Sequence, residues 1–160
     1  MIIEMYTGDG AVTEYSSTLT KEQRKHARNQ MTMHFCELLE RSRYENLYWM
    51  GSMIDLVDLA HEVYMTETLI DREGHPLPFG LIARRIFAAL HMPMPSNLYS
   101  MAYNARNRKG VKQTSMFSRY CLMLYDMKAQ RPLNRLVERR GWRRTELSLR
   151  QWHRVFPMLF

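Results

Sequence analysis

Cysteine is scarce in this chain of 160 residues. Cys36 and Cys121 are the only two, and they lie far apart in the sequence. A disulfide framework or a cysteine-based zinc site requires more cysteines at closer spacings. We therefore expect two reduced thiols that are buried, as free cysteines usually are.

Long hydrophobic runs are also missing. No segment approaches the roughly 18 uninterrupted apolar residues of a membrane-spanning helix. The first ten residues, MIIEMYTGDG, lack the basic region and apolar core of a signal peptide. These absences predict a cytoplasmic protein with no membrane span.

Signatures of catalysis are few. No glycine-rich phosphate loop is present, and His61 and Glu62 begin a zinc-protease helix motif in which Met65 replaces the second histidine. Cys36 has His34 only two positions away, a spacing at which helical side chains do not face each other. We expect no enzymatic activity, no cofactor and no metal.

Three carboxylates offer the remaining catalytic alternative. Asp55, Asp58 and Glu62 are spaced three and four residues apart, so a helix would place them on one side. A metal nuclease would need further ligands, and none can be identified. We interpret the three residues as a solvated helix surface.

Positive charge is concentrated in the second part of the chain. The net charge is +7, but residues 1–100 hold 9 Lys and Arg against 13 Asp and Glu, whereas residues 101–160 hold 14 against 3. Such asymmetry favours a polyanionic partner, most often nucleic acid, over an anionic membrane surface. A basic tail that only keeps the protein in solution is the other alternative.

Hydrophobic periodicity predicts a mainly α fold. Helical spacing and capping residues predict helices at 20–43, from Ser52, from Pro78 to Leu90, at 96–109 and from Ser115 to about 130. We divide the chain into an N-terminal segment with an amphipathic helix (1–46), a DNA-binding domain (47–130) and a basic C-terminal extension (131–160).

The middle of the chain has the element order of a helix-turn-helix domain of winged type. A helix, a short extended segment at 66–77, a second helix and a tight turn with Pro93 and Pro95 precede the helix at 96–109. The hairpin of a winged domain is not evident after Gly110, where Ser115 predicts another helix instead.

The helix at 96–109 is the candidate recognition helix, capped by Ser96 and ended by Gly110. On a helical wheel, Leu98, Ala102 and Ala105 form a core stripe. The opposite stripe consists of Ser100, Tyr103, Asn104 and Asn107. Asparagine amides can bond adenine edges, so this face suits the major groove, although an ordinary solvated helix can carry the same residues.

The predicted DNA contacts divide into two roles. Asn104 and Asn107 would read bases, with Ser100 and Tyr103 on the same face. Phosphate contacts would come from Arg106, Arg108, Lys109, Lys112 and Arg119.

A set of spaced residues resembles the C-terminal domain of the RteC family. The set consists of Trp49, Gly51, Ser52, Asp55, Leu56, Val57, Leu59, Asp71, Gly74, Phe79, Ile82, Tyr99, Arg106, Asn107, Arg108 and Lys109. RteC proteins are regulators from Bacteroides-type bacteria, associated with tetracycline-responsive control of conjugative transposon excision. The resemblance covers roughly residues 47–125 and implies a mainly helical helix-turn-helix protein that binds DNA through residues 106–109.

Two features depart from that family. The region before Trp49 is short for its N-terminal domain, and the arginine-rich end after Arg131 is additional. In that end, Trp142, Leu149, Trp152 and Phe156 could line a basic amphipathic helix. Our main hypothesis is a regulator of transcription or of a mobile element that binds double-stranded DNA. The alternative is a non-catalytic protein interaction module, and the helix at 20–43 could make a homodimer contact in either case.

Overall fold

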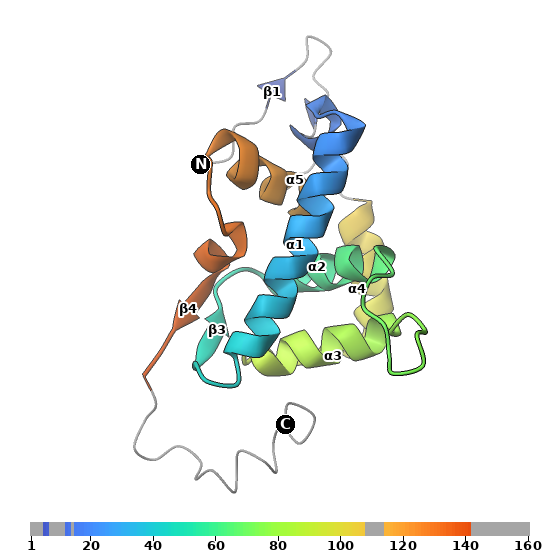
Figure 1. Cartoon of the computed structure of the whole chain (residues 1–160), viewed down its shortest axis with the longest axis vertical. Coiled ribbons are helices and arrows are strands. Elements are labelled where there is room, and N and C mark those ends of the chain that lie inside the picture. The colour runs from blue at the N-terminus through green and yellow to red at the C-terminus, as the bar shows by residue number, and fades with distance from the viewer. Residues whose placement is uncertain (1–4, 7–11, 14, 108–113, 142–160) are drawn as a thin grey trace, which may run out of the picture.

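The computed structural model describes residues 5–6, 12–13, 15–107 and 114–141, and in this part the protein is mainly α-helical (Figure 1). The α-helices are α1 (Lys21–Arg41), α2 (Met53–Met65), α3 (Phe79–Ala89), α4 (Leu98–Arg106) and α5 (Met116–Cys121). The strands are β1 (Met5–Tyr6), β2 (Val12–Thr13), β3 (Leu47–Trp49) and β4 (Val137–Arg139). Shorter helical turns are η1 (Tyr15–Thr18), the π-helix η2 (Leu122–Asp126) and the 3₁₀-helix η3 (Pro132–Leu136).

Helix α1 begins where the sequence predicts. The Thr20 hydroxyl accepts a hydrogen bond from the Gln23 amide at 3.1 Å, and the Gln23 side chain accepts one from the Thr20 amide at 2.9 Å. This reciprocal capping box satisfies two amides that the first turn leaves without partners. The expected apolar stripe is confirmed, since Ala27, Met31 and Phe35 are fully buried.

Helix α2, which the sequence predicts from Ser52, is the central helix of the fold. Its N-cap is Ser52, whose hydroxyl accepts a hydrogen bond from the Asp55 amide at 3.2 Å. Helices α1, α3, α4 and α5 all pack against α2. Apolar side chains therefore cover much of its circumference, and Leu56, Val57 and Leu59 are fully buried.

Two of the three acidic residues of α2 are not on a solvated surface, so that prediction is wrong for Asp55 and Asp58, whereas Glu62 is partly exposed. Asp55 and Asp58 are only 4% and 2% exposed. Each carboxylate has a specific partner on or beside α5, because Asp55 pairs with Arg119 and Asp58 accepts a hydrogen bond from the Met116 amide at 2.9 Å. Helical spacing placed these carboxylates on one side of α2 but could not show that another helix covers them.

The chain between α2 and α4 follows the predicted order with shifted ends. Pro78 is the N-cap of α3 rather than its first residue. Helix α4 begins at Leu98, and its N-cap, Asn97, makes no side-chain capping bond, so the prediction that Ser96 caps this helix is wrong. The helix is shorter than expected, with Asn107 as its C-cap. Gly110 lies outside the described residues.

Beyond α4, the chain continues into a helix, as predicted from Ser115. The Ser115 hydroxyl accepts a hydrogen bond from the Ser118 amide at 3.2 Å and caps α5, which continues into the π-helix η2. One burial prediction from the sequence needs correction here. Cys36 is only half-buried, whereas Cys121 is fully buried, as expected.

Two small antiparallel sheets complete the described part, and neither was predicted. Strand β1 pairs with β2, while β3 pairs with β4 near the end of the described chain, with Trp49 opposite Val137. At the joint after β3, the Trp49 indole donates a hydrogen bond to the Ser52 carbonyl. A Cβ atom on Gly51 would lie 2.9 Å from the indole nitrogen, so this close approach requires glycine.

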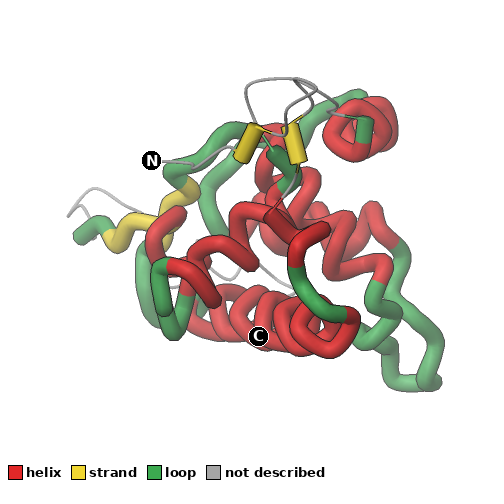
Figure 2. Tube along the Cα trace, turned by 90° about the horizontal axis from the view of Figure 1, so that it is seen from above, coloured by secondary structure: helices red, strands yellow, loops and turns green. Residues whose placement is uncertain are grey.

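One hydrophobic core crosses the domain boundaries that we drew after residues 46 and 130. It includes Phe35 from α1, Leu56 from α2, Tyr120 from α5 and Leu133 from η3. Figure 2 shows the strands at the periphery of this helical body. None of the described helices combines the length and apolarity needed to cross a membrane. Residues 142–160, with the predicted amphipathic stripe, lie outside the described residues.

Candidate nucleic-acid interface

Helix α4 is positioned by its small and apolar face. Leu98, Ala102 and Ala105 are buried, and α4 packs chiefly against α2. Two alanines on the contact face let the helix backbones approach closely. The predicted core stripe of α4 is therefore confirmed.

The opposite face of α4 is open. Tyr99 and Tyr103 are 71% and 69% exposed, and the remaining polar residues on this side are exposed as well. These residues are Ser100, Asn104, Arg106 and Asn107. The predicted contact residues of α4 within the described part are thus all exposed, with Arg106 at the flank of the polar stripe, and Tyr99, which was not among them, is exposed as well.

Tyr99 is anchored at the start of α3. Its ring meets the Phe79 ring edge to face, with centroids 5.6 Å apart, while most of the side chain stays in solvent. Tyr103 follows one turn later along α4. An exposed aromatic pair beside exposed amides can contact both the apolar and the polar groups of base edges.

Asn107 has a local partner. Its side-chain Nδ2 donates a hydrogen bond to the Tyr103 carbonyl at 2.9 Å, which satisfies an acceptor at the end of α4. Among the described residues, the Asn104 side chain makes no such hydrogen bond, and Asn104 is exposed. Of the two amides, that of Asn104 is therefore the one more available to a partner.

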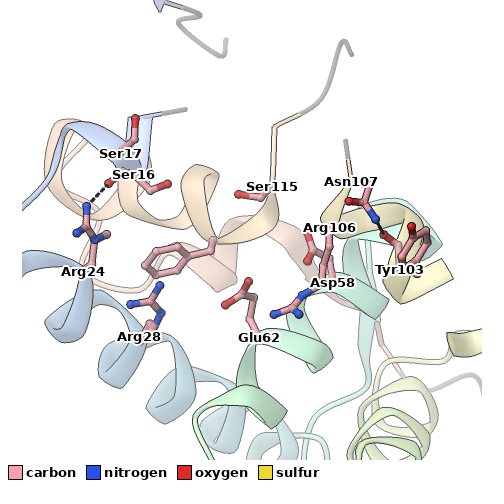
Figure 3. A pocket seen from close by; sticks show the side chains of 11 residues that line it. Ser16, Ser17, Arg24, Arg28, Asp58, Glu62, Tyr103, Arg106, Asn107 and Ser115 are labelled. Carbon is pink, nitrogen blue, oxygen red and sulfur yellow. Dashed lines mark hydrogen bonds between the residues drawn. The ribbon is translucent and has the colours of Figure 1, made fainter. Parts of the chain in front are cut away.

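A pocket of about 610 Å³ adjoins the C-terminal half of α4 (Figure 3). Tyr103, Arg106 and Asn107 line it from α4. The other lining residues are Ser16, Ser17, Arg24, Arg28, Asp58, Glu62, Ser115 and Phe117. Figure 3 shows Arg24 and Arg28 on one side and Arg106 on the other, with Glu62 between them.

The two arginines from α1 are held in different ways. Arg24 donates to the Leu19 carbonyl at 3.0 Å, and more distantly to the Ser16 carbonyl at 3.5 Å. The Arg28 guanidinium lies 4.5 Å from the centre of the Phe117 ring, a cation–π contact between α1 and α5. Both guanidinium groups are thus oriented toward the pocket from a rigid helix.

Arg106 influences its surroundings electrostatically. Burial lowers the pKa of His61 on α2, and the positive charge of Arg106 lowers this pKa further. His61 Nδ1 is buried and has no hydrogen-bond partner among the described residues. Burial and the positive charge of Arg106 thus both favour the uncharged form of His61.

Arg119 is the predicted contact residue that does not join the exposed face of α4. Its two terminal nitrogens donate to the two carboxylate oxygens of Asp55, and its side chain is 15% exposed. The Arg119 guanidinium is therefore engaged by Asp55 and is no longer expected to contact phosphate. Arg108, Lys109 and Lys112 lie outside the described residues.

A group of possible metal ligands lies elsewhere, on an exposed turn. Ligand atoms of Asp71, Glu73 and His75 all lie within 4.8 Å of one another. The turn is built by the Asp71 carboxylate, which accepts hydrogen bonds from the Glu73 and His75 amides at 2.9 Å. This internal bonding accounts for the close approach of the three side chains.

Arg24 and Arg28 were not predicted from the sequence as site residues. A signal was present, because Lys21, Arg24, Lys25 and Arg28 follow the spacing of one helix face. The net negative charge of residues 1–100 concealed this local basic stripe. Comparison with known proteins adds no further assignment, since no protein-family model, curated protein or solved structure matches this chain.

Proposed function

We propose that the protein binds double-stranded DNA in a sequence-specific manner and acts as a regulator. The observation that carries the proposal is the exposed face of α4, with its two tyrosines, its amides and Arg106. The buried face of the same helix is fixed against α2, so its exposed side chains are presented on a rigid support. A helix of this kind can enter a major groove and contact base edges.

The charge distribution supports the same proposal. Residues 101–160 carry 14 Lys and Arg against 3 Asp and Glu, and α4 lies at the start of this segment. Cationic side chains near a groove-binding helix would meet phosphates and fix its register on the duplex. Control of transcription or of a mobile element rests on the resemblance to RteC proteins and is part of this proposal.

The test is selection from a pool of randomised duplex DNA at two salt concentrations. We expect enrichment of a defined site and steep salt dependence of binding. Asn104→Ala should then relax the preference at one base pair by about 1–3 kcal/mol. Gln130→Ala, which removes an exposed amide between η2 and η3, is the matched control and should leave the preference unchanged.

A lysine variant tests the predicted contacts with phosphate. Lys112→Ala should weaken binding to all sequences alike and lower the salt slope by about one. Binding without any enriched sequence would contradict base reading by α4. A complete lack of duplex binding would contradict the proposal itself.

An apolar surface formed by α1 and the segment between α2 and α3 favours the alternative of a protein interaction module. Met33 of α1 and Ile70 of that segment are 55% and 57% exposed, beside two pockets that Cys36 and Leu69 both line. Exposed apolar side chains that gather on one surface are typical of protein contacts. Sedimentation of the purified chain would show whether this surface joins two copies into a homodimer.

A further inference from the structure

The basic face of α1 continues beyond the pocket. Lys21, Arg24, Lys25 and Arg28 lie at positions i, i+3, i+4 and i+7 of one helix. At 100° per residue these four positions fall within one stripe of about 100°. Lys21, Lys25 and Arg28 are exposed, and Arg24 is half-buried. We call these four residues the α1 basic stripe.

The stripe reaches α4 through the pocket. Arg24 and Arg28 line the pocket from α1, and Arg106 lines it from α4 (Figure 3). Segments that are far apart in the sequence thus place three guanidinium groups around one cavity. The hydroxyl-bearing residues Ser16, Ser17 and Ser115 also line it.

The pocket is not uniformly positive. Glu62 and Asp58 contribute carboxylates, and the Asp58 carboxylate accepts a hydrogen bond from the Met116 amide. Among the described lining residues, the three arginines leave one positive charge in excess. Lys21 and Lys25 add two more on the stripe outside the pocket.

We infer that the pocket and the α1 basic stripe form a single phosphate-binding track for the backbone of a nucleic acid. Guanidinium groups bind phosphate oxygens through paired hydrogen bonds, and serine hydroxyls are common additional donors. The inference rests on the proposed function and deepens it, since it adds a second contact surface on α1 to the one on α4.

Length favours a polynucleotide over a small phosphorylated molecule. From Lys21 to Arg28 a helix rises about 10.5 Å. One strand of duplex DNA presents a phosphate about every 3.4 Å along the helix axis, so about three phosphates fall within this length. A single small anion would use the pocket but would leave Lys21 and Lys25 without a role.

The test compares salt dependence in two triple variants. Lys21→Gln/Lys25→Gln/Arg28→Gln removes three cations of the stripe. Arg72→Gln/Lys128→Gln/Arg135→Gln removes three exposed cations that do not line the pocket, and it is the matched control. Binding of the full chain to a duplex is measured by fluorescence anisotropy over a salt series.

We expect the stripe variant to bind all sequences more weakly and to lower the slope of log K against log salt by about 2.7, at about 0.9 per phosphate contact. The control variant should change the slope by less than about one. Circular dichroism and urea unfolding check that both variants fold. If the stripe variant were unstable, Lys21→Gln/Lys25→Gln, which leaves the contact of Arg28 with Phe117 intact, should still lower the slope by about 1.8.

Failure of this inference can be told apart from failure of the proposed function. An unchanged slope in the stripe variant, with Asn104→Ala still relaxing sequence preference, would overturn the track and leave DNA binding by α4 intact. Titration with pyrophosphate distinguishes a polynucleotide track from a site for a small phosphorylated molecule. Binding of pyrophosphate that depends on Arg28, in a chain that binds no duplex, would overturn both the polynucleotide track and the proposed function in favour of a small-phosphate site.

Discussion

Arg119 on α5 holds both carboxylate oxygens of Asp55 in the first turn of α2, and both side chains are largely withdrawn from solvent. The Nη1 to Oδ2 distance is 3.0 Å. This pair joins two helices that are more than sixty residues apart in the chain. The sequence had predicted instead that Asp55 lies on a solvated helix surface and that Arg119 contacts phosphate.

Removing either member of this pair should destabilise the fold strongly. Asp55→Ala or Arg119→Ala leaves one buried charge without its partner, which costs about 3–5 kcal/mol of unfolding free energy. Urea denaturation of both single variants and the double variant forms a double-mutant cycle. The double variant should be more stable than the sum of the two losses predicts, by about 0.5–3 kcal/mol.

The surface pair of Arg43 with Glu40, at 3.4 Å, is the control for this cycle. Glu40 lies in the last turn of α1 and Arg43 just beyond its C-cap, and an exposed pair of this kind should couple by no more than about 1 kcal/mol. Equal coupling in the two cycles would show that burial does not strengthen the pair of Asp55 and Arg119.

Stability should fall in mild acid because two histidines have lowered pKa values in the folded chain. His34 Nδ1 lies 2.5 Å from the Tyr120 hydroxyl in the interface of α1 and α5. Burial, helped by the charge of Arg131, lowers the pKa of His34 from its ordinary value of 6.5. The pKa of His61 is lowered in the same direction. The folded chain therefore binds fewer protons than the unfolded chain as the pH falls through 6.5, so the unfolding free energy decreases there.

The measurement is urea unfolding between about pH 7.5 and about pH 5.5. His34→Gln should be less stable than the parent at neutral pH but should show a shallower loss on acidification. A His34 variant with the same pH dependence as the parent would contradict the assignment.

Glu62→Gln should tighten binding to duplex DNA. Glu62 is a carboxylate that lines the arginine pocket, so its removal takes away repulsion toward a phosphate. Because the pocket is open to solvent, we expect an effect of about two- to fivefold at low salt. Glu67→Gln, at an exposed position just beyond α2, is the control. Unchanged or weaker binding by Glu62→Gln would indicate that DNA does not approach the pocket.

The two thiols should differ in reactivity. Burial raises the pKa of Cys121 to about 12 and also raises the pKa of the half-buried Cys36. Since the thiolate is the reactive form, an aromatic disulfide reagent at neutral pH should label Cys36 slowly and Cys121 only after unfolding. Folded Cys36→Ser should therefore incorporate no label on the timescale at which the parent reacts. Rapid labelling of that variant would show that Cys121 is accessible.

The individual helices were largely predictable because their signals are local. The capping box of Thr20 and Gln23, the caps at Ser52 and Ser115 and the apolar stripes act within a few residues. Helix ends were less predictable. Ser96 is a suitable capping residue in isolation, yet α4 begins at Leu98, where packing of its short apolar face against α2 places it.

Only part of the candidate site could be predicted from the sequence. The exposed face of α4 followed from periodicity, whereas the pocket did not, since its arginines come from α1 and α4 and its serines from η1 and the cap of α5. Strands β3 and β4 were missed for a related reason. Each has three residues, too few for a periodic signal, and their pairing joins positions about ninety residues apart.

The sequence by itself determined the mainly helical character, the inward and outward faces of α1 and α4, and the accumulation of positive charge after residue 100. These properties depend on spacing along one chain segment, which helical geometry converts directly into faces. Only the tertiary structure decided which charges are available to a partner. Helix α5 covers Asp55 and Asp58 and pairs its own Arg119 with Asp55, while α1 and α4 contribute Arg24, Arg28 and Arg106 to one pocket. Burial and proximity of this kind depend on which helices pack together, and no pattern within a single helix encodes them.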